Sequence, residues 1–198
     1  MPVRKAIPGK HGVYFMTFTC TNWLSLFKLC NAYDAVYKWF DSLKEPGHYI
    51  IGYAPAAFGV PGHVHAIIAF SNTGKTINSI VSNGKRFIAY DLIMKLTEQN
   101  QHLILQELAS SLNNTQKKEG KLHNVFETSF DRKECRTKMF IQQKLDYIHF
   151  NPCKARMVAL PEQYEHSSAK FYLTGEHGIY PVTSFMGLRD IDLTKSRK

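Results

Sequence analysis

Short stretches rich in apolar residues predict four strands. Three of them are dominated by β-branched and aromatic residues, which favour strands. These are Gly12–Thr21, His48–Phe58 and Gly62–Phe70, and the last two, joined around Val60-Pro61-Gly62, predict a hairpin. A weaker alternation of apolar and polar residues over His123–Phe130 predicts the fourth strand.

Apolar residues at three- and four-residue spacing predict helices between the strands. Thr76 is the expected N-cap of the second helix. Pro152 is the expected end of the last helix, because proline removes a backbone N–H and clashes with the preceding turn. Leu29 and Phe87 belong to predicted inward faces, and Gly84 weakens the second helix. The predicted helices are Lys28–Leu43, Thr76–Leu96, Gln101–Leu112 and Arg136–Asn151.

The order of these elements predicts an α+β fold. Strand, helix, strand, strand, helix, strand is the order of the ferredoxin-like (split βαβ) antiparallel sheet with helices packed on it. An extra helix over residues 136–151 would carry a tyrosine, and the polar stretch Asn113–Lys121 predicts an exposed loop. We expect one domain over residues 1–174 and a partly flexible C-terminal extension over residues 175–198.

The charge of the chain favours a polyanionic partner. Lys and Arg number 25 against 16 Asp and Glu, which gives a formal net charge of +9. Basic residues that contact phosphates release counterions, and aromatic residues stack on bases. No apolar stretch approaches the length of a membrane span. We therefore expect a cytoplasmic, nucleoid-associated protein without a membrane partner. The 4 cysteines form no C-x-x-C pair and are expected to be buried free thiols.

His63 and His65 are the first candidates for chemistry. Residues i and i+2 of a strand point to the same face, so both imidazoles would reach one cation. With 9 His among 198 residues, chance alone gives about 0.4 such pairs. The pair nevertheless opens a strand that is otherwise apolar, where buried polar groups need partners. The alternative is a pair of hydrogen-bonded histidines at the mouth of a strand.

Tyr147 and Asn151 are the second candidates. They are four residues apart in a predicted helix, so they share one of its faces. A phenol can attack phosphorus, and an amide oxygen can complete the shell of a hard cation. The alternative is a core tyrosine followed by an asparagine near the end of the helix.

These motifs together resemble a known family. The segment Pro61-Gly62-His63-Val64-His65, followed about eighty residues later by Tyr147-Ile148-His149-Phe150-Asn151-Pro152, resembles the REP-associated tyrosine transposases and their insertion-sequence relatives among the HUH nucleases. The segments Val125–Arg132, Lys154–Val158 and Glu165–Ala169 also resemble family segments, so the similarity runs from about residue 10 to about residue 172. Many relatives carry Asn where this chain has Gly62.

The resemblance implies a role for each matched residue. His63 and His65 would bind Mg²⁺ or Mn²⁺, with Asn151 as the third ligand or its near neighbour. Tyr147 would attack single-stranded or hairpin DNA and form a 5′-phosphotyrosine intermediate, as a DNA transposase does. Insertion-sequence relatives act as dimers that exchange the tyrosine helix, while REP-associated ones can act as monomers, so a homodimer is one expected state. The candidate DNA contacts are Lys85, Arg86, Arg132, Lys133, Arg136, Lys144, Lys154 and Arg156.

Two other functions remain open at this point. The first is a nucleic-acid-binding module without catalysis, which would use the sheet as a platform. The second is a zinc hydrolase that binds its metal through His63, His65 and a third ligand such as His123 or Glu127. The first predicts binding without cleavage, and the second predicts activity that survives the loss of Tyr147.

Overall fold

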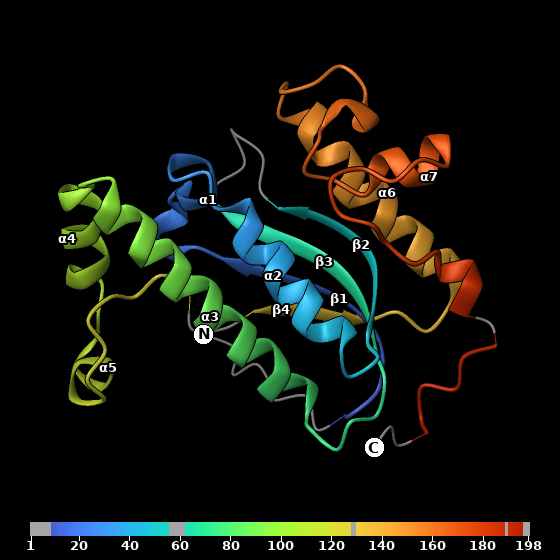
Figure 1. Ribbon diagram of the computed structural model, residues 1–198, viewed down its shortest axis with the longest axis horizontal. Helices are drawn as coiled ribbons and strands as arrows, with labels where there is room; N and C mark the ends of the chain where they lie inside the picture. Colours follow the sequence, from blue (N-terminus) through green and yellow to red (C-terminus); the bar gives the residue numbers. More distant parts are fainter. Residues whose placement is uncertain (1–8, 56–61, 128–129, 189, 196–198) are drawn as a thin grey trace.

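A four-stranded antiparallel sheet forms the centre of the computed structural model, which describes residues 9–55, 62–127, 130–188 and 190–195 (Figure 1). The strands lie in the order β2 (Tyr49–Pro55), β3 (His63–Phe70), β1 (Gly12–Thr19) and β4 (Asp131–Glu134). This arrangement confirms the predicted α+β fold. The helices are α1 (Leu26–Leu29), α2 (Tyr33–Lys44), α3 (Ile77–Glu98), α4 (His102–Ser110), α5 (Asn114–Lys118), α6 (Lys138–Lys154) and α7 (Ala169–Thr174).

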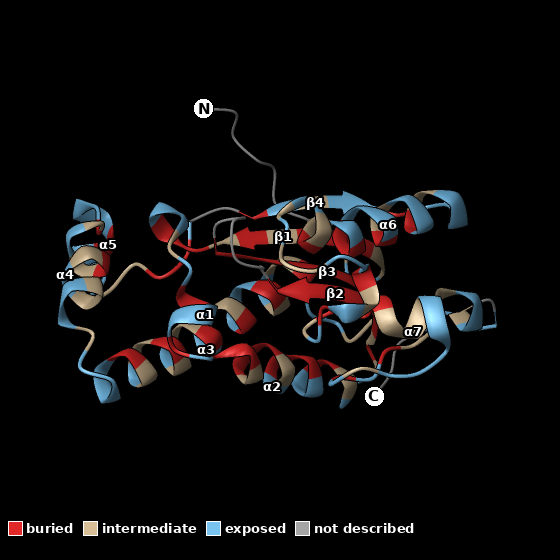
Figure 2. Cartoon of the chain, turned by 90° about the horizontal axis from the view of Figure 1, so that it is seen from above, coloured by how far each residue is buried: buried red, intermediate tan, exposed pale blue. Residues whose placement is uncertain are grey.

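The sheet separates two apolar cores, because successive residues of a strand point to opposite faces. Met16 and Phe18 of β1 belong to the larger core, which includes the buried residues of α2 and α3. Phe15 of β1 and Ile67 of β3 belong to the smaller core, which includes the buried residues of α6. Figure 2 shows the resulting three layers, with α6 on one side of the sheet and α2 and α3 on the other.

The first predicted helix is divided into two. Cys30 ends α1, and Asn31 follows in the left-handed region with φ of 45°, a conformation that asparagine tolerates better than most residues. The chain can therefore turn before α2 begins at Tyr33. The prediction that Leu29 faces inward was wrong, since this side chain is 44% exposed.

The second predicted helix is continuous as α3. The Thr76 side chain accepts a hydrogen bond from the Ser79 backbone N–H at 3.2 Å, so the predicted N-cap is confirmed. Gly84 does not interrupt the helix. It lies where Trp39 of α2 packs closely, and a Cβ at this position would meet the indole nitrogen. Phe87 was predicted to face inward, but it is 60% exposed.

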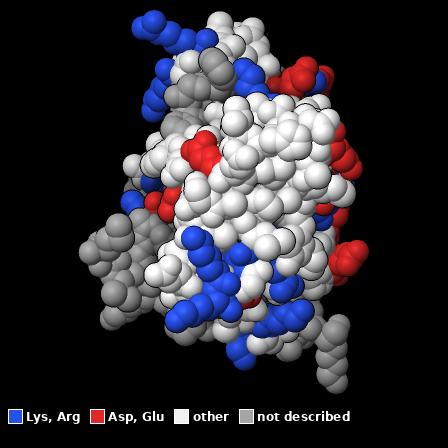
Figure 3. All heavy atoms as spheres, turned by 90° about the vertical axis from the view of Figure 1, so that its left-hand side faces the viewer, with Lys and Arg blue, Asp and Glu red and all other residues white. Residues whose placement is uncertain are grey.

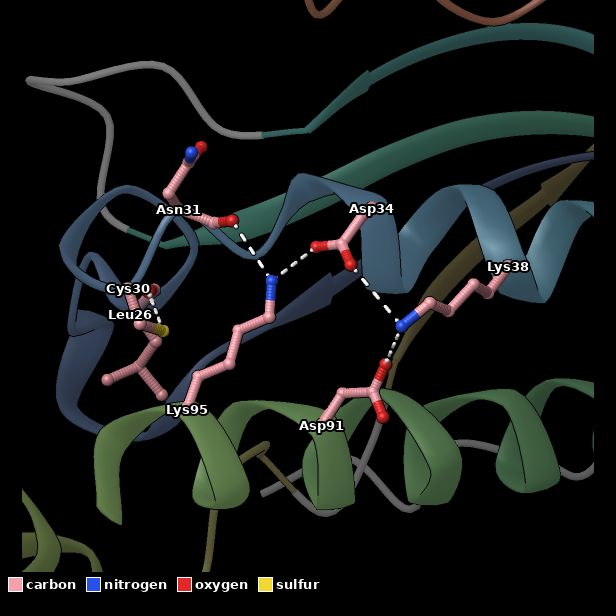
Figure 4. A network of polar contacts seen from close by, with 7 residues as sticks. All are labelled: Leu26, Cys30, Asn31, Asp34, Lys38, Asp91 and Lys95. Atoms are coloured by element: carbon pink, nitrogen blue, oxygen red, sulfur yellow. Dashed lines mark hydrogen bonds and ion pairs between the residues drawn. The ribbon is translucent and has the colours of Figure 1, made fainter. Parts of the chain in front are cut away.

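Polar contacts join α2 to α3 along their exposed sides (Figure 4). The Lys95 ammonium donates to the Asp34 carboxylate at 2.6 Å and to the Asn31 carbonyl at 3.2 Å. Lys38 bridges Asp34 at 3.3 Å and Asp91 at 3.1 Å. Each exposed ion pair contributes at most about 1 kcal/mol, so the network fixes how the helices align more than how stable they are.

Three predictions after α4 were wrong in detail. The predicted loop over 113–121 contains α5, because the side chains of Asn113 and Gln116 cap the helix reciprocally. The predicted strand over 123–130 shows, in its described residues, one isolated bridge from Phe126 to Cys20, and β4 follows it. Pro152 lies inside α6 rather than at its end. The last turn continues because proline removes only one donor and the Ala155 N–H still reaches the Asn151 carbonyl.

The C-terminal residues pack on the rest of the molecule. Tyr180 and Val182 are buried in the larger core, and the Thr183 N–H donates to the Ile50 carbonyl at 2.8 Å. Cys20, Cys30 and Cys135 are buried free thiols, as predicted, and Cys153 is half-buried and free. Within the described ranges, none of the helices has the length and apolar character that crossing a membrane requires.

Candidate active site

The two histidines lie side by side on β3, on the face of the sheet that α6 covers. His63 and His65 alternate with residues of the larger core, so they point with Ile67 toward the smaller one. Their ring centroids are 4.2 Å apart, and the residues are only 6% and 4% exposed. Strand alternation thus places two imidazoles together in a nearly buried position.

Thr17 of β1 fixes the orientation of His65. The two residues are directly opposed in the β1–β3 register, and the Thr17 hydroxyl lies 2.7 Å from Nδ1 of His65. Nε2 of His65 is buried and has no hydrogen-bond partner in the described part of the chain. Burial, and secondarily the neighbouring His63, hold the pKa of His65 well below its usual value, so the ring is neutral.

Tyr147 reaches the same place from α6. Its ring centroid lies 5.5 Å from that of His65, in an edge-on arrangement. Phe15 of β1 stacks on His65 at 5.7 Å and meets the Tyr147 ring edge-on at 6.0 Å. Tyr147 is 43% exposed, which contradicts the alternative that it is a core tyrosine. The phenol is therefore held beside the histidines and remains open to solvent.

Two lysines of α6 flank the tyrosine. The Lys144 ammonium lies 5.6 Å from the centroid of the Tyr147 ring, and that of Lys154 lies 5.8 Å from it. Lys144 also lies 5.2 Å from the ring of Phe15. Residues three or four positions apart share a helix face, which explains the position of Lys144. Both lysines therefore add positive charge beside the phenol.

The donor atoms at this site suit a divalent metal. With its proton on Nδ1 and donated to Thr17, the His65 ring keeps a lone pair on Nε2, as a metal ligand must. Asn151 follows Tyr147 by one turn of α6 and is half-buried. Over the described ranges, no group of three or more His, Cys, Asp or Glu side chains could hold a metal. This finding speaks against a zinc site with His123 or Glu127 as third ligand.

The other basic candidates are distributed over several elements. Lys133 is opposed to Phe15 in the β1–β4 register and so shares the face of the sheet that carries the histidines, whereas Arg132 is opposed to Met16 and points to the other face. Arg136 is paired with Glu134 at 2.8 Å.

Lys85 and Arg86 belong to α3, in the opposite layer of the molecule. The Lys85 ammonium donates to the Glu127 carbonyl at 2.6 Å, and burial lowers the pKa of this lysine to about 8. Its position indicates a structural role. Arg86 is exposed and lies 5.3 Å from the ring of its neighbour Phe87. Arg156, just after α6, is exposed with φ of 57°. Lys85 and Arg86 of α3 therefore lie apart from the histidines and the tyrosine.

Basic side chains form two groups on one side of the molecule. In Figure 3, Lys and Arg side chains gather at the upper and lower ends of the face, and mostly uncharged side chains with a few acidic ones lie between them. α5 lies on this side of the molecule, and its last turn contains Lys117 and Lys118 (Figure 1).

Thr17, Phe15 and Trp23 were missed as site residues. Trp23 meets the His63 ring edge-on at 6.4 Å. Alternation along β1 places Phe15 and Thr17 on one face, but only the pairing of β1 with β3 brings them to the histidines. The presence of glycine at position 62 also has a structural reason, because a Cβ there would collide with the Leu24 carbonyl oxygen. A larger residue would not fit at this position.

Comparison with known proteins identifies the fold. The sequence matches no protein-family model and no curated protein. Among solved structures, the chain is similar to a REP-associated tyrosine transposase bound to a REP hairpin, with a TM-score of 0.56 and 17% sequence identity. The match covers 98% of this chain and 93% of the other. The two proteins share an architecture over almost their whole length.

Proposed function

We propose that this protein is a metal-dependent DNA nuclease and strand transferase of the REP-associated tyrosine transposase kind. The observation that carries the proposal is the approach of Tyr147 to His65 within one chain, at 5.5 Å between ring centroids. The shared fold supports it. The residues that the sequence motifs single out come from β3 and α6, which lie far apart in the sequence. A purely structural tyrosine would not need to be 43% exposed beside the histidines.

Tyr147 is the nucleophile in this proposal. Its hydroxyl oxygen attacks a DNA phosphorus and loses its proton, and the bond from phosphorus to the 3′ oxygen breaks. The products are a 5′-phosphotyrosine and a strand with a free 3′-hydroxyl. Because one phosphoester replaces another, a later hydroxyl can reverse the reaction and join strands without a nucleotide cofactor. Lys144 and Lys154 bind the phosphate and offset its charge near the phenol.

His63, His65 and Asn151 would hold the metal, Mg²⁺ or Mn²⁺. Bound there, the ion supplies neutralisation of phosphate charge and orientation of the scissile bond. Thr17 keeps His65 in the ligating tautomer, and burial keeps it neutral. Phe15 stacks on His65 and so limits its rotation. The chain thereby prepares a ligand and a nucleophile in fixed positions before DNA arrives.

Single-stranded or hairpin DNA is the proposed substrate. The similar transposase is bound to a REP hairpin, and this chain carries a net charge of +9. Lys133, Lys144 and Lys154 are the proposed contacts near the site, because they share its face or flank Tyr147. We expect weaker contributions from Lys85 and Arg136, which are already engaged within the protein.

Covalent capture tests the proposal. The protein is incubated with end-labelled hairpin oligonucleotides and Mn²⁺, and adducts are separated by denaturing electrophoresis. We expect an adduct with the wild type and none with Tyr147→Phe, while DNA binding stays within about twofold. Tyr90→Phe on α3 is the matched control, since Tyr90 is also exposed. An adduct with Tyr147→Phe would show that the nucleophile is another residue. Binding without any adduct in the wild type would favour the non-catalytic binding module.

A further inference from the structure

A pocket lies between α2 and α3, in the layer opposite to the candidate active site. It has a volume of about 340 Å³, within the range of small-molecule sites. Its walls come from the second half of α2, the segment between α2 and β2, the segment between β3 and α3, and the first half of α3. Its main lining residues are Trp39, Leu43, His48, Thr73, Lys75 and Phe87.

The pocket lies beside the contacts that join the two helices. The polar network of Figure 4 joins the first half of α2 to the second half of α3. Trp39 then packs against Gly84, where a Cβ would come within 2.2 Å of the indole nitrogen. Leu43 and Pro46 of one side and Asn83 of the other also line the pocket. The close contact at Gly84 therefore forms one wall of the pocket.

The polar part of the lining includes two buried groups without a hydrogen-bond partner among the described residues, together with an exposed cation. Trp39 is 5% exposed, and its Nε1–H is buried without a hydrogen-bond partner in the part of the chain that the structure describes. The buried Thr73 hydroxyl is in the same situation. Lys75 and Asn83 are exposed contributors to the lining, which contains no Asp or Glu among its described residues. Such a lining fits a ligand with a flat apolar body, acceptor atoms and negative charge.

We propose that this pocket binds one unpaired nucleotide of a DNA strand, with the base against Trp39 and the phosphate at Lys75. A base offers carbonyl and ring-nitrogen acceptors to Trp39 and Thr73, and it can stack on Phe87, which is 60% exposed. The choice of a DNA strand as the source rests on the proposed function. The nucleotide in this pocket would lie in the layer opposite to the phosphate that Tyr147 attacks.

Tryptophan fluorescence can report on the pocket directly. The chain has 2 Trp, so Trp23→Phe leaves Trp39 as the single reporter. This protein is titrated with dAMP, dGMP, dCMP and dTMP, and with a single-stranded oligonucleotide. We expect a saturable change in emission with the oligonucleotide and with at least one mononucleotide. Lys75→Met and Asn83→Phe should weaken both by at least tenfold. Ser82→Phe on the same helix and Lys117→Met on α5 are the matched controls and should leave both unchanged.

Three binding results would overturn the proposal. Unchanged Trp39 emission with every ligand would show that no nucleotide binds here. A response to mononucleotides without one to the oligonucleotide would assign the pocket to free nucleotides. A response that Asn83→Phe leaves intact would place the binding elsewhere. Adduct formation by the wild type is measured in parallel. No adduct, together with a Trp39 response to the oligonucleotide, would refute the proposed function alone. An adduct, together with an unresponsive Trp39, would refute this inference alone.

Discussion

At the scale of single residues, His65 shows how a neighbouring side chain prepares an imidazole. The Thr17 hydroxyl lies 2.7 Å from its Nδ1, and Nε2 is left buried without a partner in the described residues. A buried nitrogen of this kind costs free energy unless something binds to it. Cation binding would offset that cost, so the geometry at Thr17 and the metal proposal support each other.

Thr17→Val should weaken metal binding without unfolding the protein. Valine keeps the shape of threonine but cannot accept the His65 proton, so we expect 10–100-fold lower Mn²⁺ affinity, the range typical of lost outer-shell partners. Titration followed by calorimetry measures the effect. Thr17→Ser should retain most of the affinity, and His63→Ala with His65→Ala should abolish it. Thr21→Val removes a buried hydroxyl that also lacks a partner in the described residues, and it should change nothing. Unaltered affinity in Thr17→Val would contradict the assigned role.

His166 connects the segment after α6 to α2. Its ring stacks on Tyr33 with centroids 3.7 Å apart, and its Nδ1 lies 2.8 Å from the Tyr37 hydroxyl. Burial lowers the pKa of His166, so the folded state holds it neutral over a range in which the unfolded chain protonates it. Its contribution to stability is complete above the unfolded pKa, near 6.5, and is lost as pH falls through the folded pKa.

We therefore expect His166→Gln to reduce the acid sensitivity of the protein. Urea unfolding at pH 7 and at pH 5 should show a smaller loss of unfolding free energy in the variant than in the wild type. His102→Gln on α4 serves as the control, because His102 is exposed and its replacement should leave the difference unaltered. An identical pH dependence in wild type and His166→Gln would refute this explanation.

At the scale of elements, glycine sets how closely two helices approach. Gly84 of α3 faces the indole of Trp39, and any Cβ would come within 2.2 Å of its nitrogen. The sequence predicted that this glycine weakens the helix. The tertiary contact reverses that interpretation, because the missing side chain is what lets α2 and α3 pack.

Gly84→Ala should consequently destabilise the protein, although alanine favours helices by about 1 kcal/mol relative to glycine. Overpacking against a rigid indole costs about 1–3 kcal/mol, so the net effect is a loss of stability. Chemical denaturation measures it. Ser82→Ala, at an exposed position of the same helix, should be neutral or slightly stabilising. Greater stability of Gly84→Ala would show that α3 can move away from Trp39 without cost.

At the scale of the whole molecule, the open question is which chain supplies the tyrosine. In the structure, α6 packs on the sheet of its own chain, and Tyr147 lies 5.5 Å from His65 between ring centroids. A homodimer with exchanged tyrosine helices, which is one of the expected states, is thus not required to bring Tyr147 to His65.

Mixing two inactive variants distinguishes the two arrangements. Tyr147→Phe retains the histidines, and His63→Ala with His65→Ala retains the tyrosine. We expect the mixture to form no covalent DNA adduct, because a site built within one chain is incomplete in both proteins. Denaturing and refolding the two variants together allows their tyrosine helices to exchange if they can, so this is the stringent test. Recovery of up to a quarter of wild-type adduct would show that a partner chain supplies Tyr147.

Local pattern in the sequence determined the elements and the nature of the candidate site residues. A short apolar run identified the strand that carries His63 and His65, and spacing placed Tyr147 and Asn151 on one helix. Apolar runs and helical spacing depend on neighbouring residues alone, so they can be read along the chain. The helix break at Asn31 was not predicted because it depends on the left-handed backbone of one residue. Helix α5 was not predicted because it depends on a reciprocal cap at its start.

Only the tertiary structure decided which of these residues meet. The register of β1 against β3 brings Thr17 to His65, and the packing of α6 brings Tyr147 and Lys144 to the same face. The pocket beside Trp39 likewise depends on how α2 and α3 approach each other. Pairing register and helix packing depend on contacts between segments far apart in the sequence. No pattern within one segment contains that information.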